Sequence, residues 1–246
     1  MSGRSLKWPK RLVIVRHGQS ELNVAKDLLD EGLPETLTLL AGKRDVDVDL
    51  TQTGIWQAEQ TGVFLANKEP FDICFSSPYR RAIRTAHIIT SQFGYKIQLF
   101  KDNRIREKEF GTLHGLTTDD IERQFPHEYT ARKREGRYWY RLPGGENYPD
   151  VEQRLHSFLD KLVRDWADKS VLVITHQVPY LMTRALFQHL DEDGVLVLGD
   201  VPNCGMQEYV PDTSKSPEGR MLLRSFNITA YHTVRKEEPA ATQYTK

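Results

Sequence analysis

The stretch Arg11-Leu-Val-Ile-Val-Arg16, followed directly by His17 and Gly18, decides the fold class of this chain. Its unbroken apolar run, rich in β-branched residues, is typical of a strand that is buried on both faces of a parallel sheet. The stretch Ser170-Val-Leu-Val-Ile-Thr175 has the same character and is also followed by a histidine, His176. Ligands bind at the carboxyl ends of such strands, so we expect the two imidazoles to share one pocket.

Strand-like and helix-like segments alternate along the rest of the chain. Further strands are predicted over Phe71–Phe75 and Lys96–Phe100, with an edge hairpin made of Cys204–Val210 and Met221–Asn227. Apolar residues at helical spacing predict helices after Leu50–Gly54 and over residues 79–93, 150–167 and 178–190. Residues 24–48 are expected to form a loop that can include a short helix, and residues 102–148 an irregular excursion from the sheet. This order predicts an α/β fold, a three-layer α/β/α sandwich with a mostly parallel central sheet.

Length and composition favour one globular domain over residues 1–246, with a lid insertion at residues 112–148 and a flexible tail at residues 232–246. Lys and Arg number 34, as do Asp and Glu, so the zero net charge gives no general attraction for nucleic acid or an anionic membrane. The chain has neither a long apolar run nor a segment that resembles a signal peptide. We therefore expect a cytoplasmic protein, with no membrane or nucleic-acid partner, in which Cys74 and Cys204 are reduced, packed thiols.

Arginines near the ends of two predicted strands favour phosphate binding. Arg16 directly precedes His17, and a pair of arginines, Arg80 and Arg81, follows the strand Phe71–Phe75. Two histidines and two arginines in one pocket suit a phosphate dianion, and neighbouring cations favour the neutral, nucleophilic form of histidine. Gly18 would allow backbone N–H groups to approach the phosphate oxygens.

Five segments of the chain, in order, resemble motifs of the histidine phosphatase superfamily, which includes the cofactor-dependent phosphoglycerate mutases. They are Arg16-His17-Gly18-Gln19-Ser20-Glu21-Leu22-Asn23, the helix start Leu50-Thr-Gln-Thr-Gly54 with Gln57-Ala58, the arginine-bearing stretch Ser76 to Thr85, the stretch Arg106-Glu107-Lys-Glu-Phe-Gly111, and the strand Val171-Leu-Val-Ile-Thr-His176. The resemblance extends from about Arg11 to Val210 and implies a phosphoglycerate mutase-like fold. Gln19 stands where the family usually has Glu, and we expect little consequence.

The resemblance also implies a role for each matched residue around the phosphate. His17 would be the nucleophile that becomes phosphorylated, while Arg16, Arg81 and His176 would bind the phosphoryl oxygens and neutralise developing charge. Asn23 would donate a hydrogen bond to the same group, although a simple helix or turn cap is an alternative interpretation. No metal and no cofactor is implied, because the cations do the work that a metal would do.

Glu107 is the residue that the resemblance implies as the acid and base. It would protonate the leaving alcohol and then activate the water that hydrolyses phosphohistidine. Glu107 is preferred to Glu109 because it stands three residues before the Phe-Gly pair. Similarly, Arg81 is preferred to Arg80 because it immediately precedes the Ala-Ile-x-Thr stretch.

The run from Arg132 to Arg141 interleaves basic and aromatic residues and has the most unusual composition in the chain. One interpretation is a solvated helix face with aromatic anchors packed on the domain. The other is a lid over the phosphate pocket, in which Arg134 and Arg137 would meet a second anionic group of the substrate. A nucleic-acid surface is less well supported, because this is one short run in a neutral protein.

The expected reaction is hydrolysis of a small phosphate monoester, so the expected partner is a small phosphorylated metabolite. Residues 116–148 do not resemble the insertions of the family's mutases. A phosphoglycerate mutase-type phosphotransferase is nevertheless an alternative, as is a sugar-bisphosphate phosphatase, a branch that the stretch from Gln19 to Asn23 resembles. A non-catalytic phospho-ligand binding module is disfavoured because all reacting groups are present. An edge strand over Met221–Asn227 leaves a homo-oligomer open.

Overall fold

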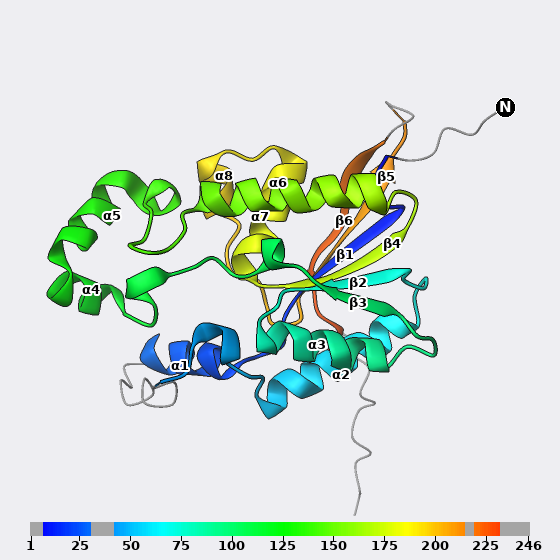
Figure 1. Cartoon of the computed structure of the whole chain (residues 1–246), viewed down its shortest axis with the longest axis horizontal. Helices are drawn as coiled ribbons and strands as arrows, with labels where there is room; N and C mark the ends of the chain where they lie inside the picture. Colours follow the sequence, from blue (N-terminus) through cyan, green and yellow to red (C-terminus); the bar gives the residue numbers. More distant parts are fainter. Residues whose placement is uncertain (1–6, 31–41, 215–218, 232–246) are drawn as a thin grey trace, which may run out of the picture.

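The computed structural model describes residues 7–30, 42–214 and 219–231, and these contain a six-stranded sheet in the order β3-β2-β4-β1-β5-β6 (Figure 1). The strands are β1 Arg11–Arg16, β2 Ile73–Ser76, β3 Gln98–Lys101, β4 Ser170–Thr175, β5 Met206–Asp212 and β6 Arg220–Ile228. Strands β1 to β4 are parallel, whereas β5 pairs antiparallel with both β1 and β6. The predicted mostly parallel sheet and its edge hairpin are confirmed, with most strand ends shifted by a few residues.

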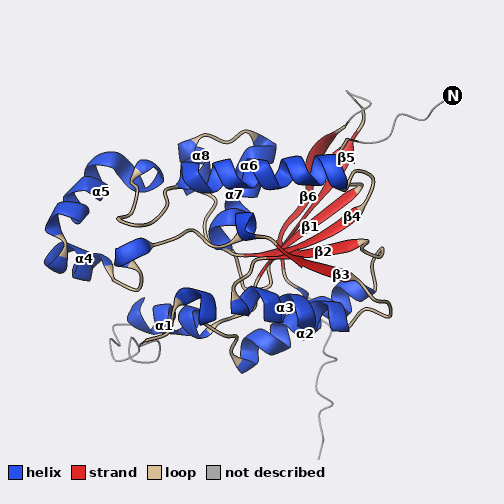
Figure 2. Ribbon diagram, in the orientation of Figure 1, coloured by secondary structure: helices blue, strands red, loops and turns tan. Residues whose placement is uncertain are grey.

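Helices cover both faces of the sheet and give the predicted three-layer arrangement (Figure 2). One layer consists of α2 Gln52–Ala66 and α3 Arg80–Ser91, and the other of α6 Tyr148–Asp165, α7 Gln177–Gln188 and α8 Glu192–Leu196. Alternation along β1 divides the core, because Leu12 and Ile14 pack with α6 and α7 while Val13 and Val15 pack with α2 and α3. Both faces are apolar, which explains the unbroken apolar run inside this strand.

The pairing of β1 with β4 places the two predicted histidines side by side. Arg16 is the partner of Thr175 in this parallel register, so His17 and His176 each lie one residue beyond the paired ends. Neighbouring strands lie about 4.8 Å apart, and the centroids of the two imidazole rings are 5.0 Å apart. Their proximity therefore follows from strand register alone.

The short helix allowed for in residues 24–48 is present, and it begins before that range. Helix α1 spans Glu21–Asp30, and Leu22 and Ala25 on one face of it are buried. Residues 31–41 lie outside the described part of the chain. A short 3-10 helix, Asp45–Asp47, then contacts α3. The apolar face of α1 is narrow, which makes this helix hard to recognise from periodicity.

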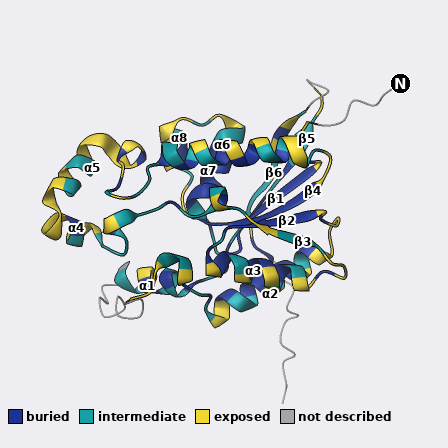
Figure 3. Ribbon diagram, in the orientation of Figure 1, coloured by how far each residue is buried: buried dark blue, intermediate teal, exposed yellow. Residues whose placement is uncertain are grey.

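The stretch 102–148 is not irregular as expected, because it contains α4 Thr118–Gln124 and α5 Pro126–Trp139. A capping box between Thr117 and Asp120 begins α4, a signal that the sequence does contain. Both helices are largely exposed and stand away from the sheet (Figure 3). The buried residue of α4, Ile121, forms a small cluster with Leu113, Tyr140 and Leu142 of the adjoining segments, whereas the buried residue of α5, Tyr138, belongs to the main core. Each helix buries only one residue, which is too few for a clear helical period.

None of the described helices is both long and apolar enough to cross a lipid bilayer. Cys74 and Cys204 are buried and free of disulfide bonds, as expected. The segment 232–246, predicted as a tail, lies outside the described residues.

Candidate active site

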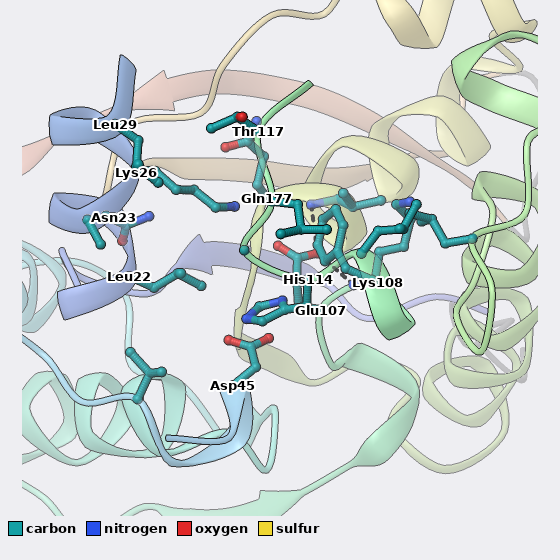
Figure 4. A pocket seen from close by; sticks show the side chains of 18 of the residues that line it. Leu22, Asn23, Lys26, Leu29, Asp45, Glu107, Lys108, His114, Thr117 and Gln177 are labelled. Atoms are coloured by element: carbon teal, nitrogen blue, oxygen red, sulfur yellow. Dashed lines mark hydrogen bonds between the residues drawn. The ribbon is translucent and has the colours of Figure 1, made fainter. Parts of the chain in front are cut away.

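A pocket of about 640 Å³ lies at the carboxyl edge of the sheet, between α1 and the segment that contains α4 and α5 (Figure 4). Its charged and histidine lining residues, among those described, are Arg16, His17, Lys26, Lys43, Asp45, Arg81, Glu107, Lys108, His114, Arg132 and Arg137. Cations thus outnumber carboxylates in this lining, which favours an anionic ligand. In the described part of the chain, no group of three or more His, Cys, Asp or Glu side chains could hold a metal ion.

The hydrogen bonds of His17 fix its tautomer. Nδ1 lies 2.7 Å from the carbonyl oxygen of Gly18, which can only accept, so Nδ1 carries the proton. Nε2 accepts a hydrogen bond of 3.3 Å from Nε of Arg81. The lone pair of Nε2 is therefore directed toward the arginine side of the pocket, where a phosphate would bind.

Arg81, rather than Arg80, is the arginine beside His17. The Arg80 side chain is largely exposed and pairs with Asp49 at 2.9 Å. Successive residues of a helix point about 100° apart, so Arg81 faces the sheet edge instead and is 2% exposed. The structure thus places Arg81, and not Arg80, in the pocket, and the role of Arg81 toward a phosphate stays a prediction.

Two buried nitrogens at the base of the pocket have no hydrogen-bond partner among the described residues: Nε of Arg16 and Nδ1 of His176. Arg16 uses its Nη1 to donate to the carbonyl oxygen of Val201. His176 uses Nε2, which lies 2.8 Å from the hydroxyl of Ser77. If that hydroxyl donates, Nδ1 is an N–H donor. Because unpaired buried polar atoms are costly, both nitrogens favour an anion at this place.

Ser77 was not predicted as a site residue, although its position carries a signal. It is the first residue beyond β2, which lies next to β4, so it stands at the same sheet edge as the two histidines. Its hydroxyl also accepts a hydrogen bond of 3.3 Å from the backbone N–H of Tyr79. The aromatic ring of Tyr79 packs against His176, with 5.1 Å between centroids.

Both imidazoles are held in the neutral form. Burial lowers the pKa of His17 well below its ordinary value, and the nearby charges of Arg81 and Arg16 lower it further. Burial likewise lowers the pKa of His176, with further contributions from Arg81 and His17. A neutral His17 keeps its lone pair at pH values where an exposed histidine would be protonated.

Glu107 enters the pocket from the segment that follows β3. Its Oε1 accepts hydrogen bonds from the backbone N–H groups of Lys108 at 2.8 Å and of Val178, in the first turn of α7, at 3.3 Å. Its Oε2 accepts none from the described residues and is available for proton exchange. Glu109, the alternative, does not line the pocket, and its carboxylate accepts from the N–H of Gly111 at 3.4 Å.

Arg154 of α6 anchors the segment that carries Glu107. It donates to the carbonyl oxygens of Arg104 at 2.6 Å and of Glu107 at 3.1 Å, and to the carboxylate of Glu146 at 3.0 Å. The Arg154 and Glu146 side chains are only 11% and 13% exposed. The backbone on both sides of Glu107 is thus fixed to the domain by one nearly buried ion pair.

Asn23 makes the helix-start contacts of one of the two interpretations offered for it, and it also lines the pocket. Its Oδ1 accepts hydrogen bonds from the N–H and the hydroxyl of Ser20, at 3.0 and 2.9 Å, at the start of α1. The same oxygen accepts from Asn203 at 3.1 Å, a residue that the sequence did not single out. The amide nitrogen of Asn23 has no partner among the described residues, and the side chain lines the pocket (Figure 4). Its donation to a phosphoryl group stays a prediction.

Gly18 was predicted to let backbone N–H groups approach the phosphate, and its own N–H is not available for this contact. This N–H donates to the hydroxyl of Thr85 at 3.1 Å, and Gly18 does not line the pocket. A Cβ atom at Gly18 would lie 2.4 Å from the carbonyl oxygen of Gly54 in α2. The glycine is therefore required for close packing between the end of β1 and this helix.

The prediction for the basic run on α5 is corrected in part. Arg137 lines the pocket, but Arg134 is 74% exposed and pairs with the adjacent Glu135 at 2.9 Å. Arg132 lines the pocket in its place, because a residue two positions further along a helix points about 200° away. At Gly136 the backbone leaves the helical conformation with φ of 80°, which redirects Arg137.

Two lysines that the sequence did not single out complete the cationic wall. Lys26 of α1 extends into the pocket (Figure 4), and its ammonium and that of Lys108 lie 5.3 and 4.7 Å from the centroid of the same ring, Phe110. Burial lowers the pKa of Lys108 to about 8, and Arg132 and Arg137 contribute to this shift. Lys108 follows Glu107 directly, and Lys26 lies three residues after Asn23 on the same helix. Their closeness in sequence to predicted site residues is the feature from which both lysines could have been predicted.

Comparison with known proteins identifies a family whose matched region contains the residues at this sheet edge. The family model described as histidine phosphatase superfamily (branch 1) matches residues 12–216. This chain belongs to the histidine phosphatase superfamily. The matched range includes His17, Arg81, Glu107 and His176, all of which line or adjoin the pocket. Members of the histidine phosphatase superfamily are phosphatases or mutases, and relatives of both kinds are found.

The 2,3-bisphosphoglycerate-dependent phosphoglycerate mutase of Cytophaga hutchinsonii is 33% identical over 183 residues, which cover 74% of this chain and 77% of that protein. A protein of the same name from a Methylobacterium species is 34% identical over 169 residues, covering 67% and 74%. The structure of the mycobacterial glucosyl-3-phosphoglycerate phosphatase superimposes with a TM-score of 0.67 at 26% identity, covering 89% of this chain and 99% of that chain. Among these relatives, the chain is similar in sequence to mutases and in structure to a phosphatase.

Proposed function

We propose that this protein is a metal-independent phosphatase that hydrolyses small phosphate monoesters through a phosphohistidine intermediate on His17. The observation that carries the proposal is the neutral His17 whose Nε2 lone pair faces Arg81 at the base of a cationic pocket. Histidine in this form is a competent nucleophile, and adjacent guanidinium groups can stabilise the charge of the transferring phosphoryl group. The same pocket contains Glu107, which can exchange protons with the leaving group.

In the first step, Nε2 of His17 attacks phosphorus and the bond between phosphorus and the ester oxygen breaks. The ester oxygen takes a proton from the carboxyl group of Glu107 and leaves as the alcohol. Nε of Arg81 transfers its hydrogen bond from Nε2 to a phosphoryl oxygen, and the unpartnered nitrogens of Arg16 and His176 donate to the others. The proton on Nδ1 remains bonded to the Gly18 carbonyl, which stabilises the positive charge on the phosphorylated ring.

In the second step, water enters on the side that the alcohol has left. Glu107, now a carboxylate, takes a proton from this water as the oxygen attacks phosphorus and the bond between nitrogen and phosphorus breaks. Inorganic phosphate is formed, His17 regains its lone pair, and Glu107 regains its proton. A mutase would use the same first step and replace water by an alcohol of a second phosphorylated molecule.

The cationic wall supports a substrate class within this reaction. Lys26, Lys108, Arg132 and Arg137 line the pocket beyond the two arginines at its base. No salt bridge joins Lys108, Arg132 or Arg137 to a carboxylate in the described part of the chain. We therefore favour small monoesters that carry a second anionic group, which would pair with these cations as the phosphate binds at His17.

The direct test compares the wild-type protein with His17→Ala in buffer that contains a chelator, between about pH 5 and 8. Wild type should release phosphate from p-nitrophenyl phosphate and become transiently phosphorylated on histidine, a linkage labile in acid and stable in base. The variant should lose both properties, with activity reduced at least about 1000-fold. If neither protein hydrolyses this ester or any member of a panel of phosphorylated metabolites, the proposed phosphatase activity is refuted.

The mutase alternative has its own support, because the curated relatives cited above carry that name at 33% and 34% identity. It is tested by incubating the protein with a phosphoglycerate and a bisphosphoglycerate primer. Interconversion of phosphoglycerates that exceeds phosphate release would replace phosphatase by mutase as the main activity. Binding of phosphorylated ligands with neither reaction would indicate a non-catalytic module.

A further inference from the structure

Arg81 has an unexpected partner in Asp45. This aspartate begins the 3-10 helix Asp45–Asp47 and lines the pocket with its carboxylate (Figure 4). Nη1 of Arg81 donates to the Asp45 carbonyl oxygen at 2.7 Å and to its Oδ1 at 2.8 Å, and Nη2 donates to its Oδ2 at 3.4 Å. The Arg81 side chain is 2% exposed, so this carboxylate is its counterion in a nearly buried place.

The geometry shows which donors Asp45 uses. A guanidinium is planar, and its five N–H groups lie on three edges in fixed directions. Asp45 takes the end edge with Nη1 and Nη2, and its carbonyl oxygen takes the remaining Nη1 proton. The side edge, formed by Nε and the second N–H of Nη2, is left facing His17, to which Nε already donates. That is the edge a phosphoryl group bound at His17 would meet.

We propose that Asp45 is a positioning residue for the phosphoryl-transfer reaction, which holds the Arg81 guanidinium so that its side edge faces the phosphoryl group. The inference rests on the proposed function of His17 and Arg81. Asp45 acts through Arg81 and need not touch the substrate. A bidentate carboxylate fixes the plane as well as the position of a guanidinium, which a single hydrogen bond does not.

Electrostatics and positioning predict opposite results when Asp45 is changed. Removing a negative charge close to an anion-binding pocket should by itself tighten the binding of anions. Asp45→Asn removes the charge and also presents an amide N–H to Nη2 of Arg81, which is a donor. If the orientation of Arg81 matters, binding should weaken although the pocket has become more positive.

The experiment measures direct binding of vanadate and inorganic phosphate by calorimetry, together with kcat and KM for p-nitrophenyl phosphate. For Asp45→Asn we expect vanadate to bind roughly 10- to 100-fold more weakly and kcat to fall more than KM rises, since misoriented groups affect the transition state most. Asp47→Asn is the matched control, because Asp47 lies on the same short helix and pairs with Arg44 rather than Arg81. It should leave all these values near those of the wild type.

Tighter or unchanged vanadate binding by Asp45→Asn would overturn the proposal and identify Asp45 as a competitor of the substrate or a simple counterion. If this variant does not fold, vanadate binding by Asp45→Glu tests the proposal instead. This change retains the charge and displaces the carboxylate by one methylene. Weaker vanadate binding by Asp45→Glu supports positioning, and wild-type binding refutes it.

Vanadate binding needs no turnover, so this result can be read even if wild type hydrolyses no ester. Absence of turnover in wild type would count against the proposed function. If Asp45→Asn binds vanadate as tightly as wild type does, the result would count against the positioning role of Asp45.

Discussion

His17 and His176 are the same residue type at the ends of adjacent strands, yet their partners give them different chemistry. The Gly18 carbonyl holds the proton of His17 on Nδ1 and leaves Nε2 with a free lone pair. The hydroxyl of Ser77 lies against Nε2 of His176 and leaves Nδ1 without a partner among the described residues, free to donate to an anion. One ring is thus suited to attack phosphorus, and the other to bind its oxygens.

Lys108 should determine how well the enzyme binds substrates with two anionic groups. Its pKa of about 8 means that the ammonium is present at neutral pH and is lost as the pH rises through that value. Lys108→Met should raise KM about 10-fold at neutral pH for an ester with a second anionic group. It should change KM for p-nitrophenyl phosphate much less. In wild type, KM for the first kind of ester should rise above about pH 8, and in the variant this rise should be absent.

Steady-state kinetics on both esters, at several pH values, check this expectation. Lys43→Met is the control, because Lys43 also lines the pocket but pairs with Glu21 at 2.7 Å. An equal loss on both esters would mean that Lys108 supports the pocket without recognising a second anion.

The residues at strand ends were predictable from sequence, and those that depend on loops were not. His17 and His176 follow apolar strands, and the parallel register of β1 with β4 makes them neighbours. Asp45 has no such signal, because its contact with Arg81 depends on the path of a loop between two helices. The packing requirement at Gly18 was not predicted, because close packing and a phosphate-binding turn both select glycine.

At the scale of elements, one ion pair joins the catalytic edge of the sheet to α6. Arg154 binds two backbone carbonyl oxygens of the segment with Glu107, and Glu146 accepts from the Glu109 N–H at 3.0 Å. This segment has little regular structure, so side chains replace the backbone ladder that would otherwise hold it.

Arg154→Leu should therefore reduce both stability and activity. It leaves the nearly buried carboxylate of Glu146 with Arg106, at 2.7 Å, as its remaining counterion, and it removes the hydrogen bonds of Arg154. We expect a cost of about 2 kcal/mol in the free energy of unfolding. With Glu107 less well placed, kcat should fall at least about 10-fold. Urea denaturation and initial rates measure the two effects.

Arg164→Ala is the control on the same helix, because Arg164 is exposed and pairs only with its neighbour Asp165. This variant should stay within about 0.5 kcal/mol of wild type and keep its activity. A stable Arg154→Leu protein with wild-type kcat would show that Glu107 is placed by other contacts.

Helices with many apolar residues at regular spacing were predicted well, and helices with few buried residues were not. Helix α6 buries six residues at helical spacing, so its range was expected within two residues at each end. Helix α5 buries only Tyr138 among its fourteen residues and is interrupted at Gly136. Its existence depends on packing with neighbouring loops, which periodicity does not report.

At the scale of the whole molecule, the two buried histidines make stability depend on pH. In the unfolded chain their pKa is about 6.5, whereas in the folded protein it is well below that value. Below about pH 6.5 the unfolded state binds more protons, so the free energy of unfolding falls as the pH is lowered toward the folded-state pKa values. Each histidine should contribute to this loss, which begins near pH 6.5.

Urea denaturation at several pH values, without phosphate, measures this loss. The two histidines contribute to the slope of the free energy of unfolding against pH. His17→Asn should remove about half of their contribution to this slope. His127→Asn changes an exposed residue of α5 and should leave the dependence as in wild type. If His17→Asn also retains the full slope, His17 is not held neutral in the folded protein.

The small hydrophobic cluster beneath α4 and α5 has a consequence for how such enzymes diversify. Leu113, Ile121, Tyr140 and Leu142 form a cluster of their own, whereas Tyr138 and Tyr148 belong to the main core. Most of this part of the chain can therefore be altered as long as these two tyrosines are kept. The arginines it carries, Arg132 and Arg137, could then be exchanged while the chemistry at phosphorus is preserved. A chimera that transplants residues 112–148 between members of the superfamily should inherit the ester preference of the donor and the nucleophile of the recipient.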